Sequence, residues 1–194
     1  MSFLTLRRPL AAPQSALRKG LAVLLLAVAR AGALAADAST AEYQIKAAFV
    51  CKFGNYVEWP AADGPRADGA FVIGVLASDV IAEAVTRAAA AHTVNGRAIV
   101  VRRPARGEPL DALAIVFVAR THAARLAEVL AAARGQPILT VTESDEPANA
   151  GVVNFVVVED KVRFDIALQP AEASNLKISG RLLAVARKVS GRPP

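Results

Sequence analysis

The sequence predicts a single α/β domain in which helices flank both faces of a mixed, mostly parallel sheet of about six strands. Three observations predict this class. Short runs rich in Val, Ile and Phe are nearly continuous, which is typical of strands that are buried on both faces. These runs alternate with helical patterns between residues 71 and 142. Two further runs near the C-terminus flank a short polar turn and indicate a hairpin, which makes the sheet mixed.

Residues 42–60 (EYQIKAAFVCKFGNYVEWP) predict an opening helix. Its apolar side chains fall at helical spacing on one stripe, which we expect to be buried: Ile45, Ala48, Phe49, Phe53, Tyr56 and Val57. Lys46, Lys52 and Glu58 fall off that stripe, and we expect the two lysines to be ordinary solvated side chains. Pro60 disfavours helical geometry at the preceding residue, so the helix should end within one or two residues of Glu58. That places Trp59 on a corner.

Two strand-helix-strand units follow a polar loop at 61–70 and resemble a loose duplication, over 71–102 and 114–142. The predicted strands are 71–76, 98–102, 114–118 and 138–142. Ser78-Asp79 should begin a helix that runs to about 91, with Ile81 and Val85 inward, and Asn95-Gly96 is a turn. Thr121 should cap a helix to about 133, with Leu126, Val129 and Leu130 buried, and Arg134-Gly135 should end it.

The C-terminal part predicts a hairpin and a last helix. Strands at 152–158 and 162–168 flank Glu159-Asp160-Lys161, and the polar segment 143–150 before them is a loop of the kind that carries recognition. Ser179 should cap the last helix. The inner face of that helix is expected to carry Leu182, Leu183, Ala186 and Val189.

The N-terminus predicts export. Residues 1–35 hold a basic region, the apolar run 21–29 and small residues around Ala35, as in a cleaved signal peptide. A run of nine residues is too short for a membrane anchor, which needs about 20. Cleavage would leave residues 36–194 as the periplasmic domain. Five of the 23 basic and none of the 17 acidic residues would leave with the signal, so the domain would carry a net charge of +1. We therefore expect no nucleic-acid partner.

Motifs for catalysis and cofactors are missing from the sequence. It has no glycine-rich phosphate-binding motif and no Gly-x-Ser-x-Gly nucleophile elbow. His92 and His122 have no ligand residues at metal-binding spacing. Cys51 is the only cysteine and cannot form an internal disulfide; we expect a partly buried thiol, with an intermolecular bridge as the alternative. We predict a binding protein with no catalytic residue, no metal and no cofactor.

Four residues are the predicted partner- or ligand-binding site: Glu58, Trp59, Arg163 and Asp165. Arg163 and Asp165 alternate with apolar neighbours in a strand, so they share one face of it. A buried face would not accept both without partners. With Glu58 and Trp59 they could line a polar and aromatic groove, in which the Arg163 guanidinium suits anionic groups. The alternative is a solvated face, or an ion pair with a helix.

Two segments resemble the YfiR family of periplasmic proteins. One has Lys-Ala-Ala-Phe at 46–49 and Val-Glu-Trp-Pro at 57–60. The other is residues 150–189, AGVVNFVVVEDKVRFDIALQPAEASNLKISGRLLAVARKV, with the family's hairpin, Arg-Phe strand and Leu-Lys-Ile-Ser lead into a last helix. Some relatives are thought to sense oxidation through cysteine pairs, and Cys51 lacks a second partner for that mode of control.

The resemblance implies a periplasmic protein that represses an inner-membrane diguanylate cyclase by contacting its periplasmic sensory domain. Two alternatives stay open: a periplasmic ligand-binding or assembly module without a cyclase partner, and a hydrolase with an unrecognised site. A small ligand and a homodimer also stay open as partners.

Overall fold

The computed structural model describes residues 40–60, 69–146 and 150–191. The predicted signal peptide lies outside the described residues. The chain divides into two compact units after Thr40, and the elements discussed below belong to the second unit. None of the helices in the described ranges is long and apolar enough to cross a membrane.

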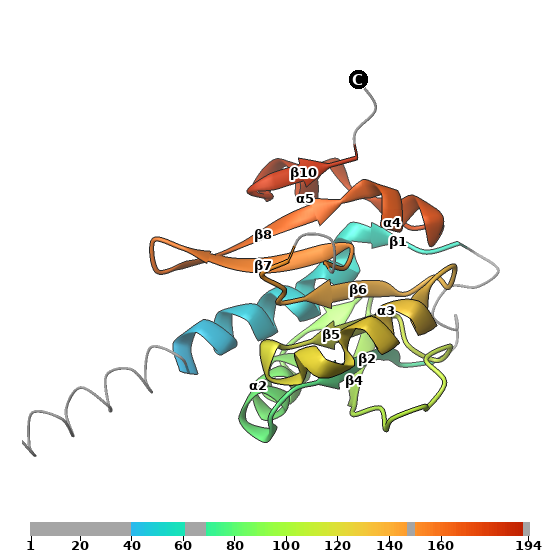
Figure 1. Cartoon of the computed structure of the whole chain (residues 1–194). Helices are drawn as coiled ribbons and strands as arrows, with labels where there is room; N and C mark the ends of the chain where they lie inside the picture. The colour runs from blue at the N-terminus through green and yellow to red at the C-terminus, as the bar shows by residue number, and fades with distance from the viewer. Residues whose placement is uncertain (1–39, 61–68, 147–149, 192–194) are drawn as a thin grey trace, which may run out of the picture. The chain divides into compact units, whose positions relative to one another are not determined.

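Eight strands form the main sheet (Figure 1). In spatial order they are β10 (Lys188–Ser190), β8 (Lys161–Ala167), β7 (Val153–Val158), β6 (Leu139–Thr142), β5 (Ile115–Val118), β2 (Phe71–Leu76), β4 (Arg97–Arg102) and β3 (Thr93–Val94). Two pairs, β7 with β8 and β3 with β4, are antiparallel, and the others are parallel. The predicted mixed, mostly parallel sheet is confirmed, and all six expected strands are present. The short edge strands β3 and β10 are additions.

Helices cover both faces of this sheet. Besides the first helix at residues 40–53, they are α2 (Asp79–Ala90), α3 (Leu126–Ala133), α4 (Leu168–Ala173) and α5 (Gly180–Val185). The larger core packs the first helix, α2 and Leu182 of α5 against one sheet face. On the other face α3 packs against Leu76, Val116 and Val118. In Figure 1, α3 lies in front of the strands and the first helix passes behind them.

The order of the strands explains why α2 and α3 lie on opposite faces. The crossover from β2 leads to β4, its neighbour toward one edge of the sheet. The next crossover, from β5, leads to β6, its neighbour toward the opposite edge. Since such crossovers are right-handed, units that run in opposite directions place their helices on opposite faces. The carboxyl ends of β2 and β5 form the switch point, where α/β folds commonly bind ligands.

The prediction for the end of the first helix is wrong. The helix stops at Phe53, a 3-10 turn covers Gly54–Tyr56, and the chain enters strand β1 (Val57–Glu58). A Cβ atom on Gly54 would lie 2.5 Å from Cγ2 of Val94, so the backbone approaches the sheet here as closely as glycine allows. Strand β1 then pairs with β9 (Lys177–Ile178). Pro60 therefore limits only how far the first helix could extend, and the helix ends before that limit.

The buried face of the first helix is rotated from the predicted stripe. Phe53 and Val57 are buried as expected, but Ile45 and Tyr56 are 48% and 37% exposed. Phe49 is half-buried and packs against the larger core. The residues that fill the inner positions are Lys46, Ala47, Val50, Cys51 and Phe53.

Helix ends elsewhere are partly as predicted. Helix α2 follows Ser78 and buries Ile81 and Val85. Thr121 does not cap α3: a 3-10 segment, Arg120–Arg125, precedes that helix, and the Thr121 hydroxyl accepts a hydrogen bond from Ser78 N at 3.3 Å across the switch point. Val129 and Leu126 are buried in α3 as predicted.

For the last helix, the predicted first residues are correct and the predicted end is wrong. The Ser179 hydroxyl accepts a hydrogen bond from Leu182 N at 3.3 Å, which confirms the predicted cap. The helix stops at Val185, however, and Val189 lies in β10, whose pairing with β8 replaces further helix. The short helix α4, of six residues, was not predicted.

Candidate functional site

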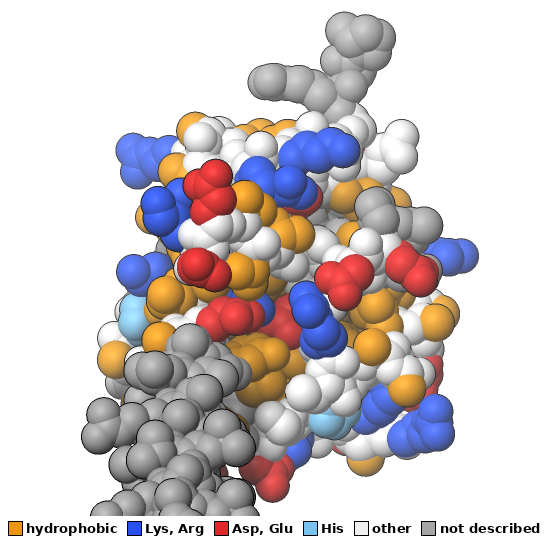
Figure 2. Space-filling model, turned by 60° about the vertical axis from the view of Figure 1, so that its left-hand side comes forward, with side chains coloured by type: hydrophobic (Ala, Val, Ile, Leu, Met, Phe, Trp, Pro, Cys, Tyr) orange, Lys and Arg blue, Asp and Glu red, His pale blue; other side chains and the backbone are white. Residues whose placement is uncertain are grey.

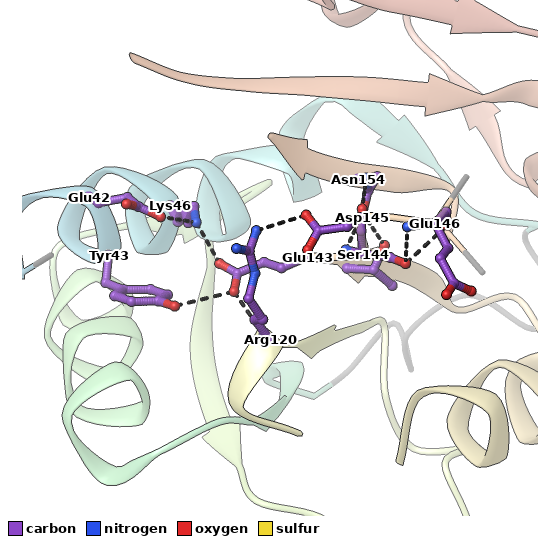
Figure 3. A network of polar contacts seen from close by, with 10 residues as sticks. Glu42, Tyr43, Lys46, Arg120, Glu143, Ser144, Asp145, Glu146 and Asn154 are labelled. Carbon is purple, nitrogen blue, oxygen red and sulfur yellow. Dashed lines mark hydrogen bonds and ion pairs between the residues drawn. The ribbon is translucent and has the colours of Figure 1, made fainter. Parts of the chain in front are cut away.

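A buried pair of opposite charges lies where the first helix meets the loop after β6 (Figure 3). Lys46 is 2% exposed and Glu143 is 4% exposed. The Lys46 ammonium lies 2.8 Å from Oε1 of Glu143 and forms a second ion pair with Glu42. Glu143 Oε1 accepts no hydrogen bond from the described residues, because its contact with Lys46 is close enough for an ion pair but is not oriented as a hydrogen bond.

The prediction that Lys46 is solvated is therefore wrong, whereas Lys52 is exposed as expected. The reason is visible in the spacing. Lys46, Val50 and Phe53 recur at intervals of four and three residues in the first helix, and all three are buried. A lysine on that stripe requires a carboxylate partner, and the partner comes from residue 143. The acidic Glu42 four residues earlier was the local signal for the pairing.

Glu143 connects three segments of the chain. Its Oε2 accepts hydrogen bonds from the Tyr43 hydroxyl at 3.3 Å and from Arg120 N at 2.9 Å. Burial, followed by the charges of Glu143 and Glu42 and the hydrogen bond to Glu143, raises the pKa of Tyr43 to about 12. The Lys46 ammonium also lies 4.9 Å from the centre of the Tyr43 ring. The first helix is thus tied to the carboxyl ends of β5 and β6.

Asn154 fixes the loop that carries Glu143. Its side-chain oxygen accepts from the Thr142 hydroxyl and from Ser144 N, both at 2.8 Å, and its amide donates to Ser144 O at 2.9 Å. Next to this loop is a hollow of about 680 Å³ lined by charges of both signs. Those charged residues are Glu42, Arg120, Asp145, Asp165, Arg187 and Lys188. Figure 2 shows acidic and basic side chains close together on one face, with hydrophobic side chains between them.

Most of the charges around the hollow are already paired. Arg120 contacts Asp145 at 3.2 Å, and Arg187 binds both carboxylate oxygens of Asp165. The hydrogen bond from Arg187 and the charge of Asp165 raise the pKa of Arg187 above its usual value. The arrangement can hold elements together and recognise polar partners through charge.

Cys51, His92 and His122 are the reactive side chains that the sequence singled out. Burial raises the pKa of the Cys51 thiol to about 11, so the thiol stays protonated at neutral pH. Nδ1 of His92 lies 2.8 Å from the Ala88 carbonyl oxygen, and Nδ1 of His122 lies 3.2 Å from the Thr121 hydroxyl. In the described ranges, no three His, Cys, Asp or Glu side chains could hold a metal ion together.

Glu58 and Trp59 line a different hollow, of about 510 Å³, at the β1–β9 pairing. Glu58 is exposed, while the half-buried Trp59 ring packs edge-on against Phe71, with 5.4 Å between ring centroids. The indole Nε1 is buried and has no hydrogen-bond acceptor among the described residues. Pro60, Glu172, Asn175, Leu176 and Lys177 complete the hollow.

Arg163 and Asp165 lie on one face of β8, in register with Val156 and Asn154 of β7. Asp165 is held by Arg187, and Arg163 is exposed. Asp165 belongs to the charged hollow, which shares no lining residue with the hollow at Glu58 and Trp59. The structure therefore places the four predicted residues in two locations. Sequence reasoning missed Lys46, Tyr43, Arg120 and Glu143.

A mostly parallel sheet covered on both faces, with a buried charge pair and two separate hollows, defines an α/β domain. The sequence profile of the YfiR/HmsC-like family matches residues 43–187, and the chain belongs to that family. Members of the family are periplasmic regulators of diguanylate cyclases rather than enzymes. No curated protein matches the chain.

Proposed function

We propose that this protein represses an inner-membrane diguanylate cyclase by binding its periplasmic sensory domain. Family membership supports a regulator of this kind. The observation that carries the choice of surface is the Trp59 indole N–H, which is buried beside a hollow and has no acceptor among the residues that the structure describes. A buried donor without a partner is rare in folded proteins. A carbonyl or carboxylate of the cyclase would accept this hydrogen bond once the half-buried indole turns its N–H toward the hollow.

Glu58 extends this surface, and Arg163 with Asp165 forms a second one on β8. Arg163 has an exposed guanidinium, which suits a carboxylate of the partner through two parallel hydrogen bonds. Asp165 is already held by Arg187 and acts by keeping β10 beside β8. Trp and Arg are the residue types that most often dominate the binding energy of interfaces.

Repression follows from differential affinity. A protein that binds the inactive state of the cyclase more tightly than the active state shifts the population toward the inactive state. Moving that population from 1:99 to 99:1 takes about 5.5 kcal/mol of difference in binding free energy. Release of the repressor would restore cyclase activity.

The test is deletion and complementation. Deleting the gene should raise cellular cyclic di-GMP and surface attachment, and the unaltered chain should reverse both. Trp59→Phe keeps an aromatic ring against Phe71 but removes the N–H donor. We expect a folded protein whose affinity for the cyclase domain is about tenfold lower, because the free energy of one hydrogen bond corresponds to about that factor. Arg163→Ala should also complement poorly. Arg87→Ala, which removes an exposed arginine of α2, is the matched control and should complement fully.

Unchanged cyclic di-GMP after deletion, together with no binding of the purified domain to a cyclase periplasmic domain, would contradict the proposal. The ligand-binding or assembly module would then be the better account. If Trp59→Phe and Arg163→Ala complement as well as Arg87→Ala, repression uses another surface of the protein.

A further inference from the structure

A groove with an apolar floor runs between the first helix and α5, away from both hollows described above. Its floor and walls are formed by Phe49, Phe53, Tyr56, Leu182 and Val185, and its volume is about 290 Å³. Val185 is 64% exposed, and Tyr56 is among the exposed large hydrophobic residues. Ile45, another of these, lies one helical turn before Phe49.

The rim of this groove is basic. Lys52 and Arg181 are its only charged lining residues, and both are exposed. Neither forms an ion pair with any residue that the structure describes. This distinguishes the groove from the charged hollow, where acidic and basic side chains are already paired with one another. An acidic partner could therefore bind without displacing an existing ion pair.

We propose that this groove docks a segment of another protein that inserts one large apolar side chain and carries acidic residues beside it. The volume lies at the lower limit of the usual range of small-molecule pockets, roughly 300–1,000 Å³, and is large enough for one apolar side chain. Apolar anchors flanked by complementary charge are the usual pattern for a helix that binds in a groove. The proposal concerns a separate surface and does not depend on the identity of the cyclase.

A second copy of this chain is a poorer occupant. A two-fold symmetric dimer through the groove would place the same patch on both sides of the contact. The basic rim of one copy would then meet the basic rim of the other, and like charges across an interface weaken binding.

Site-specific photo-crosslinking of the full chain in its host cells tests the proposal. A photoreactive residue replaces Val185, and in the control it replaces Val80, which is 62% exposed on α2. We expect an adduct at position 185 that position 80 does not give. Its crosslinked peptide should contain a large apolar residue with acidic residues within one helical turn.

Charge reversal on the rim completes the test. Lys52→Glu should lower the yield of this adduct about fivefold, the effect of one exposed ion pair, and Arg181→Glu should act in the same direction. Lys161→Glu reverses an exposed lysine at the hairpin and should leave the yield unchanged. An adduct with a second copy of the chain, an adduct insensitive to both rim variants, or no adduct above the Val80 control would overturn the proposal. Cyclic di-GMP measured in the same cells reports separately on cyclase repression.

Discussion

Lys46 occupies a position where a lysine is costly unless its charge is paired. The ammonium lies inside the protein between Glu42 and Glu143, on a helix whose neighbouring inner positions are apolar. The pair joins residues 46 and 143, which belong to the first helix and to the loop after β6. This contact holds the helix in register with the sheet, because both charges need each other once water is excluded.

Removing the Lys46 charge should destabilise the protein strongly. Lys46→Met keeps most of the side-chain volume but leaves Glu143 buried without a cation, so the free energy of unfolding should fall by about 3–5 kcal/mol. Lys52→Met on the exposed side of the same helix is the matched control and should change it by less than about 0.5 kcal/mol. Chemical denaturation of both variants measures the difference. Equal, small losses would mean that Glu143 finds water or another partner.

Tyr43 should ionise near pH 12. Burial and the neighbouring carboxylates raise its pKa from the usual 10.0, so the folded chain holds the phenol proton more tightly than the unfolded chain does. The resulting stabilisation is complete below pH 10 and is lost as the pH rises through about 12. Tyr43 and Tyr56 are the only tyrosines, so Tyr56→Phe isolates the signal in an ultraviolet titration. A midpoint at the usual value would show that Tyr43 is solvated.

At the scale of elements, sequence patterns predicted strands better than helix ends. Runs such as 71–76 are apolar enough to indicate buried strands by themselves, and β2 has the predicted bounds. Strands β3 and β10 have two and three residues, too few for any pattern to appear. The end of the first helix depends on contact between Gly54 and Val94, forty residues away, which the local sequence does not reveal. For Lys46, local signals were present in its spacing to Val50 and Phe53 and in Glu42, and only its second partner, Glu143, is distant in the sequence.

The β7–β8 hairpin has a turn that can be improved. Glu159 and Asp160 both have positive φ, 50° and 57°, which is unfavourable for side chains other than Gly, Asn or Asp. Replacing the pair by Asn-Gly, the pair already present at 95–96, should raise the free energy of unfolding by about 1 kcal/mol. Gly96→Ala is the opposite control, because φ there is 78°, and should destabilise. Thermal melts of the two variants should shift in opposite directions.

At the scale of the whole molecule, an aromatic cluster joins the first helix to the sheet. Phe53 stacks on Phe155 with 5.9 Å between ring centroids and meets Phe164 edge-on at 5.2 Å. The half-buried Phe49 ring also packs against the rings of Phe155 and Phe164. The cluster connects the opening helix to the C-terminal hairpin, so it couples segments that are far apart in the chain.

Truncating the two phenylalanines should have unequal effects on global unfolding. Phe53→Ala should cost about 3–5 kcal/mol, as for a fully buried aromatic side chain. Phe49→Ala should cost about 2 kcal/mol, because part of its surface is already in water. Denaturant unfolding with a common slope measures both. A larger loss for Phe49 than for Phe53 would mean that the groove beside Phe49 is closed in solution.

The single Trp of the chain also makes the proposed partner surface observable without labels. Trp59 lies half-buried at the rim of its hollow, with an indole N–H that has no acceptor among the described residues. Indole emission responds to solvent exposure and to hydrogen bonding at Nε1, so a protein that covers this hollow would change the fluorescence spectrum of the whole chain. Titrating candidate sensory domains against the unmodified protein would then report binding at this position directly.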